Sequence, residues 1–203
     1  MPQAPAFPMR AHSQTFLKAD WYGEDLRDST FSACTFTDCD LTEVTTSGAA
    51  FDQCRFRGTQ LNASVHRASS FTGCRFSRSS LFGATFSGCK LVGSQFSSTK
   101  LRPMTVEGGN WSYTAFRGAD LSGVDLSGVN LSESDLSEAD LRRAVLDGAD
   151  LSRAVLRSAR LSGTVLTGAS LDGVDLTAVA WKGAVIDAVQ ACLLAESLGA
   201  VIR

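Results

Sequence analysis

The chain has 203 residues, a length that fits one domain, and its formal net charge of −2 indicates neither nucleic-acid nor membrane binding. No stretch reaches the roughly 18 apolar residues of a membrane span. The start, MPQAPAFPMRAHSQ, lacks the apolar core of a signal peptide, so we expect a cytoplasmic protein whose residues 1–13 form a flexible segment.

From residue 14 to residue 186 the sequence repeats in units of five. Of the 34 unit centres between Trp21 and Ile186, 32 are Leu, Phe, Trp, Val or Ile, and the residue two places earlier is small in 32 units. Sixteen of the 18 glycines stand two places after a centre. A helix would spiral such centres around its axis, and a flat strand would alternate them between its faces. The spacing therefore predicts one corner per unit, at a turn that needs a positive φ.

Residues of one type recur at a step of 20, which indicates how many units close a coil. Phe36, Phe56, Phe76, Phe96 and Phe116 follow this step. Twenty residues are four units, so we predict a square coil in which like residues stack on one another. At about 4.8 Å per stacked strand, the units make about eight and a half coils and a rod roughly 40 Å long.

We expect the centre of each unit and the small residue two places before it to point into the coil. The polar and sulfur-containing residues at these two inner positions do not resemble a catalytic site. Thr46 and His66 are the two polar centres and are one coil apart, so we expect them to hydrogen-bond to each other. Five of the six cysteines occupy the small inner slot, where they act as compact apolar residues. No metal-ligand spacing occurs, and the only other histidine is His12. We predict no enzyme, no metal and no cofactor.

Charge divides the repeat into three zones. Seven acids and one base lie between Asp20 and Glu43, and one acid and eight bases lie between Phe51 and Val106. Eight acids and two bases follow between residues 120 and 150. Either this alternation is an ordinary solvated surface, or one zone is a partner-binding face.

The segment RPMTVEGGN departs from the rhythm of the repeat. Pro103 stands where a turn residue is expected, and Met104 overfills a small slot. We predict a bend or a local bulge here, next to the last acidic zone.

The tail IDAVQACLLAESLGAVIR predicts a helix over about 188–198, capped by Asp187 and ended by Gly199. One face is suited to covering the last coil, and a second apolar side remains. The helix is either only a lid or also part of a twofold dimer contact that the final AVIR strand completes. The residues of the covering face are Ala191, Leu194, Ala195 and Leu198, and those of the other side are Val189, Gln190, Leu193, Glu196 and Ser197.

The units ADLSG, VNLSE, EADLR and GADLS resemble the A(D/N)LXX consensus of the pentapeptide-repeat family. This resemblance covers about residues 14–186 and implies an all-β fold, a right-handed quadrilateral parallel β-helix. Residues 187–203 would follow as a C-terminal segment, made of the short α-helix and the final strand, that serves capping and dimerisation. The stretches LRPMTVEGGNW and DLRRAVLDGADLSRA, with the helical tail, resemble the DNA-mimicking gyrase-protection members of that family. They are closer to the MfpA type than to the Qnr type. Proteins of the Qnr type carry projecting loops, and the uninterrupted five-residue register of this chain leaves no room for such loops.

The resemblance implies a non-enzymatic homodimer that binds DNA gyrase or topoisomerase IV at a site meant for DNA. It would protect the topoisomerase from quinolone-type or natural-product poisons. A DNA duplex 40 Å long carries about 24 negative charges. The net charge of −2 on this chain is far smaller, so we expect it to mimic DNA only locally, around residues 120–150.

The predicted partner-binding residues are Asp120, Asp125, Glu133, Asp135, Glu138, Asp140 and Asp150, and the predicted dimerisation residues are Val189, Leu193, Leu194, Leu198 and Ile202. Two alternatives remain open. One is a structural scaffold that binds another protein partner. The other, less favoured because few aromatic residues remain for the outside, is direct nucleic-acid binding through Arg55, Arg57, Arg75 and Arg78.

Overall fold

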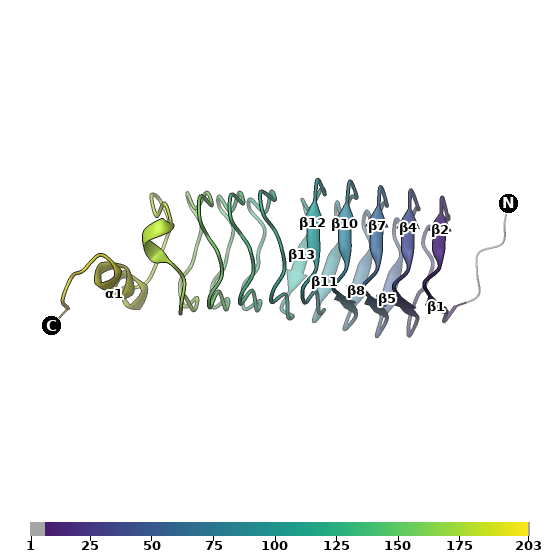
Figure 1. The fold of residues 1–203 in the computed structure, drawn as a ribbon, viewed down its shortest axis with the longest axis horizontal. Helices are drawn as coiled ribbons and strands as arrows, with labels where there is room; N and C mark the ends of the chain where they lie inside the picture. Colours follow the sequence, from purple (N-terminus) through teal and green to yellow (C-terminus); the bar gives the residue numbers. More distant parts are fainter. Residues whose placement is uncertain (1–6, 203) are drawn as a thin grey trace.

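The structure, a computed structural model, describes residues 7–202, which form a rod of stacked parallel coils with a helix at the C-terminal end (Figure 1). The strands are β1 Arg10–His12, β2 Thr15–Leu17, β3 Thr30–Ser32, β4 Thr35–Thr37, β5 Thr45–Ser47, β6 Ala50–Asp52, β7 Arg55–Arg57, β8 Val65–Arg67, β9 Ser70–Thr72, β10 Arg75–Ser77, β11 Thr85–Ser87, β12 Gln95–Ser97 and β13 Thr105–Glu107. The helices are the 3₁₀ turn η1 Leu176–Ala178 and the α-helix α1 Ala188–Ser197.

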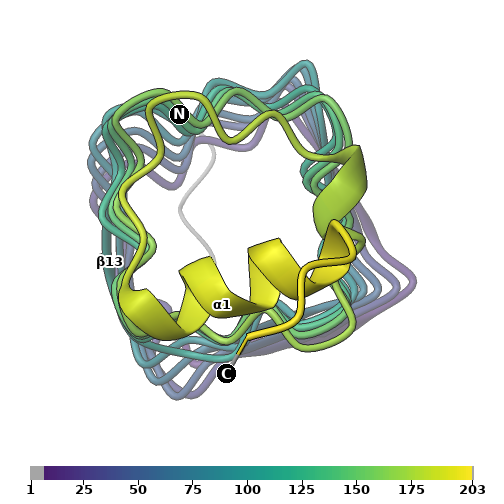
Figure 2. The ribbon, with the colours of Figure 1, turned by 90° about the vertical axis from the view of Figure 1, so that its left-hand side faces the viewer.

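Strands 20 residues apart pair in parallel, as Phe36 does with Phe56, in ten such pairs along the described chain. The strands form three sheets, and isolated bridges extend the same step as far as Val165 and Val185. The end-on view in Figure 2 shows the square outline of the coil. The predicted quadrilateral β-helix is confirmed.

We name the four sides of the rod in the order of winding. The β4 face contains β2, β4, β7, β10 and β12 and continues through Ala115, Asp135 and Val155. The bridge face consists of isolated bridges between residues such as Gln60 and Ser80. The β5 face contains β5, β8, β11 and β13, and the β3 face contains β1, β3, β6 and β9.

Stacked aromatic rings fill the N-terminal half of the interior, as the sequence predicts. Phe56 lies between Phe36 and Phe76, with ring centroids 4.8 and 4.7 Å away and planes only 6° and 5° apart. Phe31, Phe51 and Phe71 form a second stack. Buried leucines from Leu121 to Leu171 take over in the C-terminal half. Corners need a positive φ whether or not the residue is glycine, as at Gly58 (65°) and Glu133 (57°).

The rod begins earlier than the predicted boundary at residue 14. β1 pairs with β3, and Phe7 packs its ring edge-on against Trp21 at 5.4 Å. The first coil needs a cover for its buried aromatic rings, and residues 7–13 supply part of it. Residues 1–6 of the predicted flexible segment lie outside the described residues.

Pairing between neighbouring coils is interrupted next to Pro103. The coil that contains Pro103 is still paired with the coil before it, because Lys100 N donates to Ser79 O (3.0 Å) and Thr105 N donates to Ala84 O (2.9 Å). Toward the C-terminus, residues 98–108 form no backbone hydrogen bonds with residues 117–128 on the bridge and β5 faces, all of them in the described part of the chain. The predicted irregularity is therefore a loss of pairing between coils rather than an inserted residue. Pro103 has no N–H to donate, and the bulkier Met104 fills a small slot.

Candidate partner-binding surfaces

The residue directly before each centre points outward, and its side chain closes a local turn when it is Asp or Asn. Asp135 Oδ1 accepts a hydrogen bond from Ser137 N at 3.0 Å, and Asp150 Oδ1 accepts one from Ser152 N at 2.9 Å. Asn130 accepts the equivalent bond at 2.9 Å. Such Asx turns stabilise the corner locally. These acids therefore have a structural role that an asparagine also performs.

The seven acids predicted to bind a partner encircle the rod and do not gather on one side. Their order along the winding follows from the bridges between coils. Asp135 lies on the β4 face, Asp120 and Asp140 on the bridge face, Asp125 on the β5 face and Asp150 on the β3 face, while Glu133 and Glu138 lie at the two corners of the β4 face.

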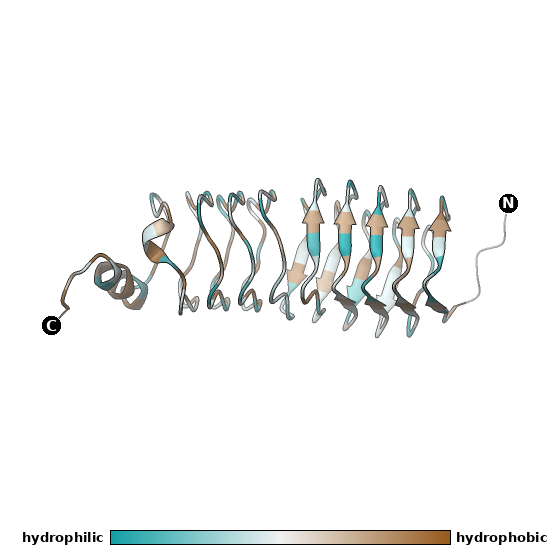
Figure 3. Cartoon of the chain, viewed as in Figure 1, coloured by the Kyte–Doolittle hydropathy of each residue, from teal (hydrophilic) through white to brown (hydrophobic). Residues whose placement is uncertain are grey.

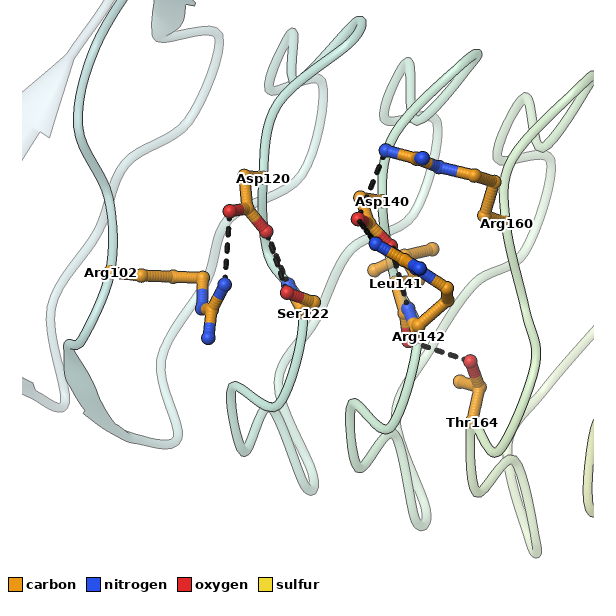
Figure 4. A network of polar contacts seen from close by, with 8 residues as sticks. All are labelled: Arg102, Asp120, Ser122, Asp140, Leu141, Arg142, Arg160 and Thr164. Atoms are coloured by element: carbon orange, nitrogen blue, oxygen red, sulfur yellow. Dashed lines mark hydrogen bonds and ion pairs between the residues drawn. The ribbon is translucent and has the colours of Figure 1, made fainter.

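Two acids of the bridge face form ion pairs with arginines of this same chain (Figure 4). Asp140 Oδ2 lies 2.7 Å from Arg142 Nη2 and 2.9 Å from Arg160 Nη2, and the Asp140 side chain is only 6% exposed. Hydrogen bonding from Arg142 holds the pKa of Asp140 down at about 2. Arg102 spans the interrupted pairing and reaches Asp120 at 3.0 Å. A partner meets little free negative charge at these two positions.

The two corner glutamates are also paired. Glu138 lies 2.7 Å from Arg117, and Glu133 lies 2.8 Å from Arg153 and accepts from the Tyr113 hydroxyl at 2.9 Å. Sequence reasoning missed these arginines. Arg102, Arg117 and Arg153 stand 18 to 21 residues from the acids with which they pair. This separation is about one coil, and it could have predicted the pairs. Of the seven acids, Asp125, Asp135 and Asp150 form no ion pair within residues 7–202.

The four arginines of the nucleic-acid alternative do come together. Arg55 and Arg57 project from β7, Arg75 projects from β10, and Arg78 follows at the corner. They line a shallow hollow of about 550 Å³ on the β4 face. This grouping follows directly from their spacing at one coil.

The one histidine of the described interior, His66, is held by hydrogen bonds on both ring nitrogens. Thr46 Oγ1 lies 2.9 Å from His66 Nδ1, and Ser64 Oγ lies 2.9 Å from His66 Nε2, so the predicted Thr46–His66 contact is confirmed and extended. Burial lowers the pKa of His66 to about 3. Desolvation raises the pKa of the Cys34 and Cys89 thiols. No cluster of three metal-ligating side chains occurs in the described part of the molecule.

Helix α1 begins and ends as predicted but presents a different face to the coil. Asp187 caps it by accepting from Gln190 N at 2.9 Å, and Gly199 follows its end with a φ of 89°. The expectation that Gln190 faces outward is wrong, because its side chain is buried and donates to Ala169 O at 2.9 Å. The expectation that Leu198 covers the coil is also wrong, since it is 72% exposed. Gln190 satisfies the free carbonyls that the last coil leaves open.

Helix α1 lies across the end of the rod (Figure 2), and it exposes apolar side chains there. Of the predicted dimerisation residues, Val189 is 70% and Leu193 41% exposed. Leu198 and Ile202 are exposed too, whereas Leu194 is half-buried against the core. Val189 and Leu193 line an open cavity of about 550 Å³ together with Leu171, Val174 and Leu176 of the last coil. Residues 200–202 adopt no strand, because a strand there needs a partner strand that a single chain does not supply, and residue 203 lies outside the described residues.

Comparison with known proteins identifies the repeat and the fold. A family model described as "Pentapeptide repeats" matches in eight copies over residues 25–58, 67–102, 107–137 and 144–179. No curated protein sequence matches the chain. Among the described residues, neither helix combines the length and the apolar character that crossing a membrane requires.

Solved structures of QnrB1, a plasmid-mediated fluoroquinolone resistance protein, superimpose on the whole rod. A trypsin-treated variant gives a TM-score of 0.85 at 24% identity, over 96% of this chain and 98% of that chain. A second trypsin-treated variant gives 0.84 at 23% identity, over the same shares of the two chains. Full-length QnrB1 gives 0.63 at 22% identity, over 94% and 100%. At these identities the likeness establishes a shared fold.

Proposed function

This chain belongs to the pentapeptide-repeat family, and on that premise we propose that it is a non-enzymatic cytoplasmic protein that binds DNA gyrase or topoisomerase IV and protects the enzyme from quinolone-type or natural-product poisons. The observation that carries this proposal is the end-to-end superposition on QnrB1, itself a fluoroquinolone resistance protein. The acids of residues 120–150 encircle the rod, as phosphates encircle a duplex, so a site that encloses DNA could enclose this part of the rod.

The mimicry in this proposal is local. Asp125, Asp135 and Asp150 supply the negative charge, because their carboxylates form no ion pair within residues 7–202. Glu133 and Glu138 are held by exposed arginines, and such exposed pairs are weak enough for a partner to displace. The buried Asp140 contributes shape rather than charge.

Replacing Asp125, Asp135 and Asp150 together by asparagine should leave the fold intact and weaken protection of gyrase. Asparagine keeps the turn-closing hydrogen bond, as Asn130 does at the equivalent slot. These three acids lie on three different faces of the rod, so a partner meets all of them only by enclosing it. Losing their charges should then raise the protein concentration needed for half-protection about tenfold. The measurement is gyrase supercoiling in the presence of ciprofloxacin, with circular dichroism to verify folding.

A matched control removes three charges from the opposite end of the rod, through Asp20→Asn, Asp40→Asn and Asp52→Asn. This control should protect as well as the unaltered protein. Equal loss in both triple variants, or no loss in the first, would reject the assignment to residues 120–150.

The internal ion pairs favour a second candidate, a scaffold that binds another protein. Four of the seven acids are neutralised within the rod, as expected for a surface that serves folding. A scaffold would leave both supercoiling and drug-induced DNA cleavage unchanged at any protein concentration. The same gyrase assay therefore separates the two candidates.

We also propose that the exposed apolar side of α1 is a twofold dimer contact. A second α1 packed against Val189 and Leu193 would close the cavity at the end of the rod. Val189→Glu combined with Leu193→Glu should convert a dimer of about twice 21.5 kDa into a monomer, measured by sedimentation equilibrium. The control Phe82→Glu places a charge at an exposed site distant from α1 and should remain dimeric. A dimer that persists in the double variant contradicts this contact.

A further inference from the structure

The β4 face of the N-terminal half carries an arginine cluster that the proposed gyrase contact does not use. Arg55 lies opposite Arg75 and Arg57 lies opposite Ser77 in the paired strands β7 and β10. Paired strands are about 4.8 Å apart, and Arg78 stands at the adjoining corner. All four guanidinium groups belong to exposed residues. Figure 3 shows the hydrophilic starts of β7, β10 and β12 side by side on this face.

This cluster lacks internal counter-charges. None of its four arginines forms an ion pair within residues 7–202, whereas other arginines of the rod pair with acids. The nearest acids in the winding are Asp38, at a corner of the preceding coil, and Asp52, on the neighbouring β3 face. Like charges placed opposite each other in a sheet are destabilising. A bound anion relieves that repulsion, so the face favours a ligand with several negative charges.

The other residues of the face indicate which polyanion fits. The hollow is lined otherwise by threonines, serines and a glutamine, and its one aromatic residue, Phe76, is buried. Protein interfaces rely on aromatic and apolar anchors at their centre, and none is exposed here. Phosphate contacts, in contrast, come from Arg, Ser, Thr and Gln side chains. Arginine also matches phosphate oxygens with two parallel N–H donors.

We infer that the β4 face binds the phosphate backbone of a nucleic-acid duplex without reading its sequence. Single strands are usually held by stacking bases on exposed aromatic rings, and this hollow exposes none. Arg55, Arg57 and Arg75 project from neighbouring strands of one sheet, and Arg78 extends the group at its corner, so the arginines form a row that suits the rigid backbone of a duplex. The inference does not depend on gyrase, because it concerns the opposite half of the rod.

The expected binding is weak and sensitive to salt. Four phosphate contacts give a slope of log affinity against log salt concentration of about −3 to −4. Affinity should therefore fall roughly a hundredfold between 50 and 200 mM salt, from a Kd in the micromolar range. Two duplexes of unrelated sequence should bind equally.

The test is fluorescence anisotropy of a fluorescein-labelled 20-base-pair DNA duplex titrated with the full chain. Changing Arg55, Arg57, Arg75 and Arg78 together to glutamine should weaken binding at least tenfold and flatten the salt slope. The control removes the same charge from the other faces, through Arg10→Gln, Lys90→Gln, Arg143→Gln and Lys182→Gln, and should bind like the unaltered chain. Circular dichroism verifies that both variants fold.

Two outcomes overturn the inference. One is equal weakening in the two quadruple variants, which would reduce the effect to bulk charge. The other is displacement of the duplex by polyglutamate at the same concentration of charges, which would make the face a site for acidic protein segments. Retention of the duplex against polyglutamate supports the phosphate assignment.

Discussion

Replacing Phe56 with alanine should lower the free energy of unfolding by about 3–5 kcal/mol. Its ring is fully buried and stacked between Phe36 and Phe76 at 4.8 and 4.7 Å. Backbone hydrogen bonds to the coils on both sides fix the spacing of the stack, so the surroundings cannot collapse into the cavity. Urea-induced unfolding followed by circular dichroism measures this loss.

Two further variants define the scale of that effect. Phe82→Ala removes an aromatic ring that is 45% exposed, and it should cost below about 1 kcal/mol. Phe56→Leu should cost less than Phe56→Ala, because leucine fills the equivalent position in the C-terminal half. Equal costs for Phe56→Ala and Phe82→Ala would show that the stack contributes nothing particular to stability.

Lowering the pH from 7 to 5 should reduce the free energy of unfolding by about 2 kcal/mol through His66. Burial lowers the pKa of this imidazole from 6.5 to about 3, so it stays neutral in the folded chain. The unfolded chain takes up a proton below about pH 6.5. The stabilising contribution is therefore complete above pH 6.5 and is lost as the pH falls from 6.5 toward 3. Urea unfolding at pH 7, 6 and 5 measures it.

His66→Leu removes this titration and serves as the control. Whatever the absolute stability of the variant, its change in the free energy of unfolding between pH 7 and pH 5 should be smaller by about 2 kcal/mol. Asp140 does not interfere, because its pKa of about 2 and the ordinary carboxyl range both lie below this window. Identical pH dependence in the two proteins would contradict a neutral, buried His66.

The fold was predictable because each five-residue unit packs against the unit 20 residues away, and both have the same pattern of inward and outward residues. The step of 20 that relates Phe36 to Phe56 also places His66 beside Thr46. One correct period therefore predicts the neighbours of the inner residues along the whole repeat. The same period predicts that Arg55 and Arg75 are neighbours, although bulk charge argues against a basic surface.

The candidate site was less predictable because the repeat places an outward side chain but does not decide which other side chain it contacts. Whether Asp140 is free or paired depends on Arg142 and Arg160, whose side chains reach it from its own coil and from the next. The tail lies beyond the repeat, so nothing in the period reveals that Gln190 turns inward. The free carbonyls of the last coil decide that orientation, and they are visible only once the coil is built.

The missing hydrogen bonds beside Pro103 make this point of the rod a hinge between two groups of coils. The stability of a solenoid is the sum of the stability of each repeat and the interaction free energy between neighbouring repeats. That interaction is weakest where two of the four faces lack hydrogen bonds between coils. The remaining two faces hold the hinge through bonds such as Phe96 N to Ala115 O (3.1 Å) and Trp111 N to Asn130 O (2.7 Å). The basic and acidic halves thus behave as two cooperative blocks that flex about one edge, and a melt with two transitions would be their signature.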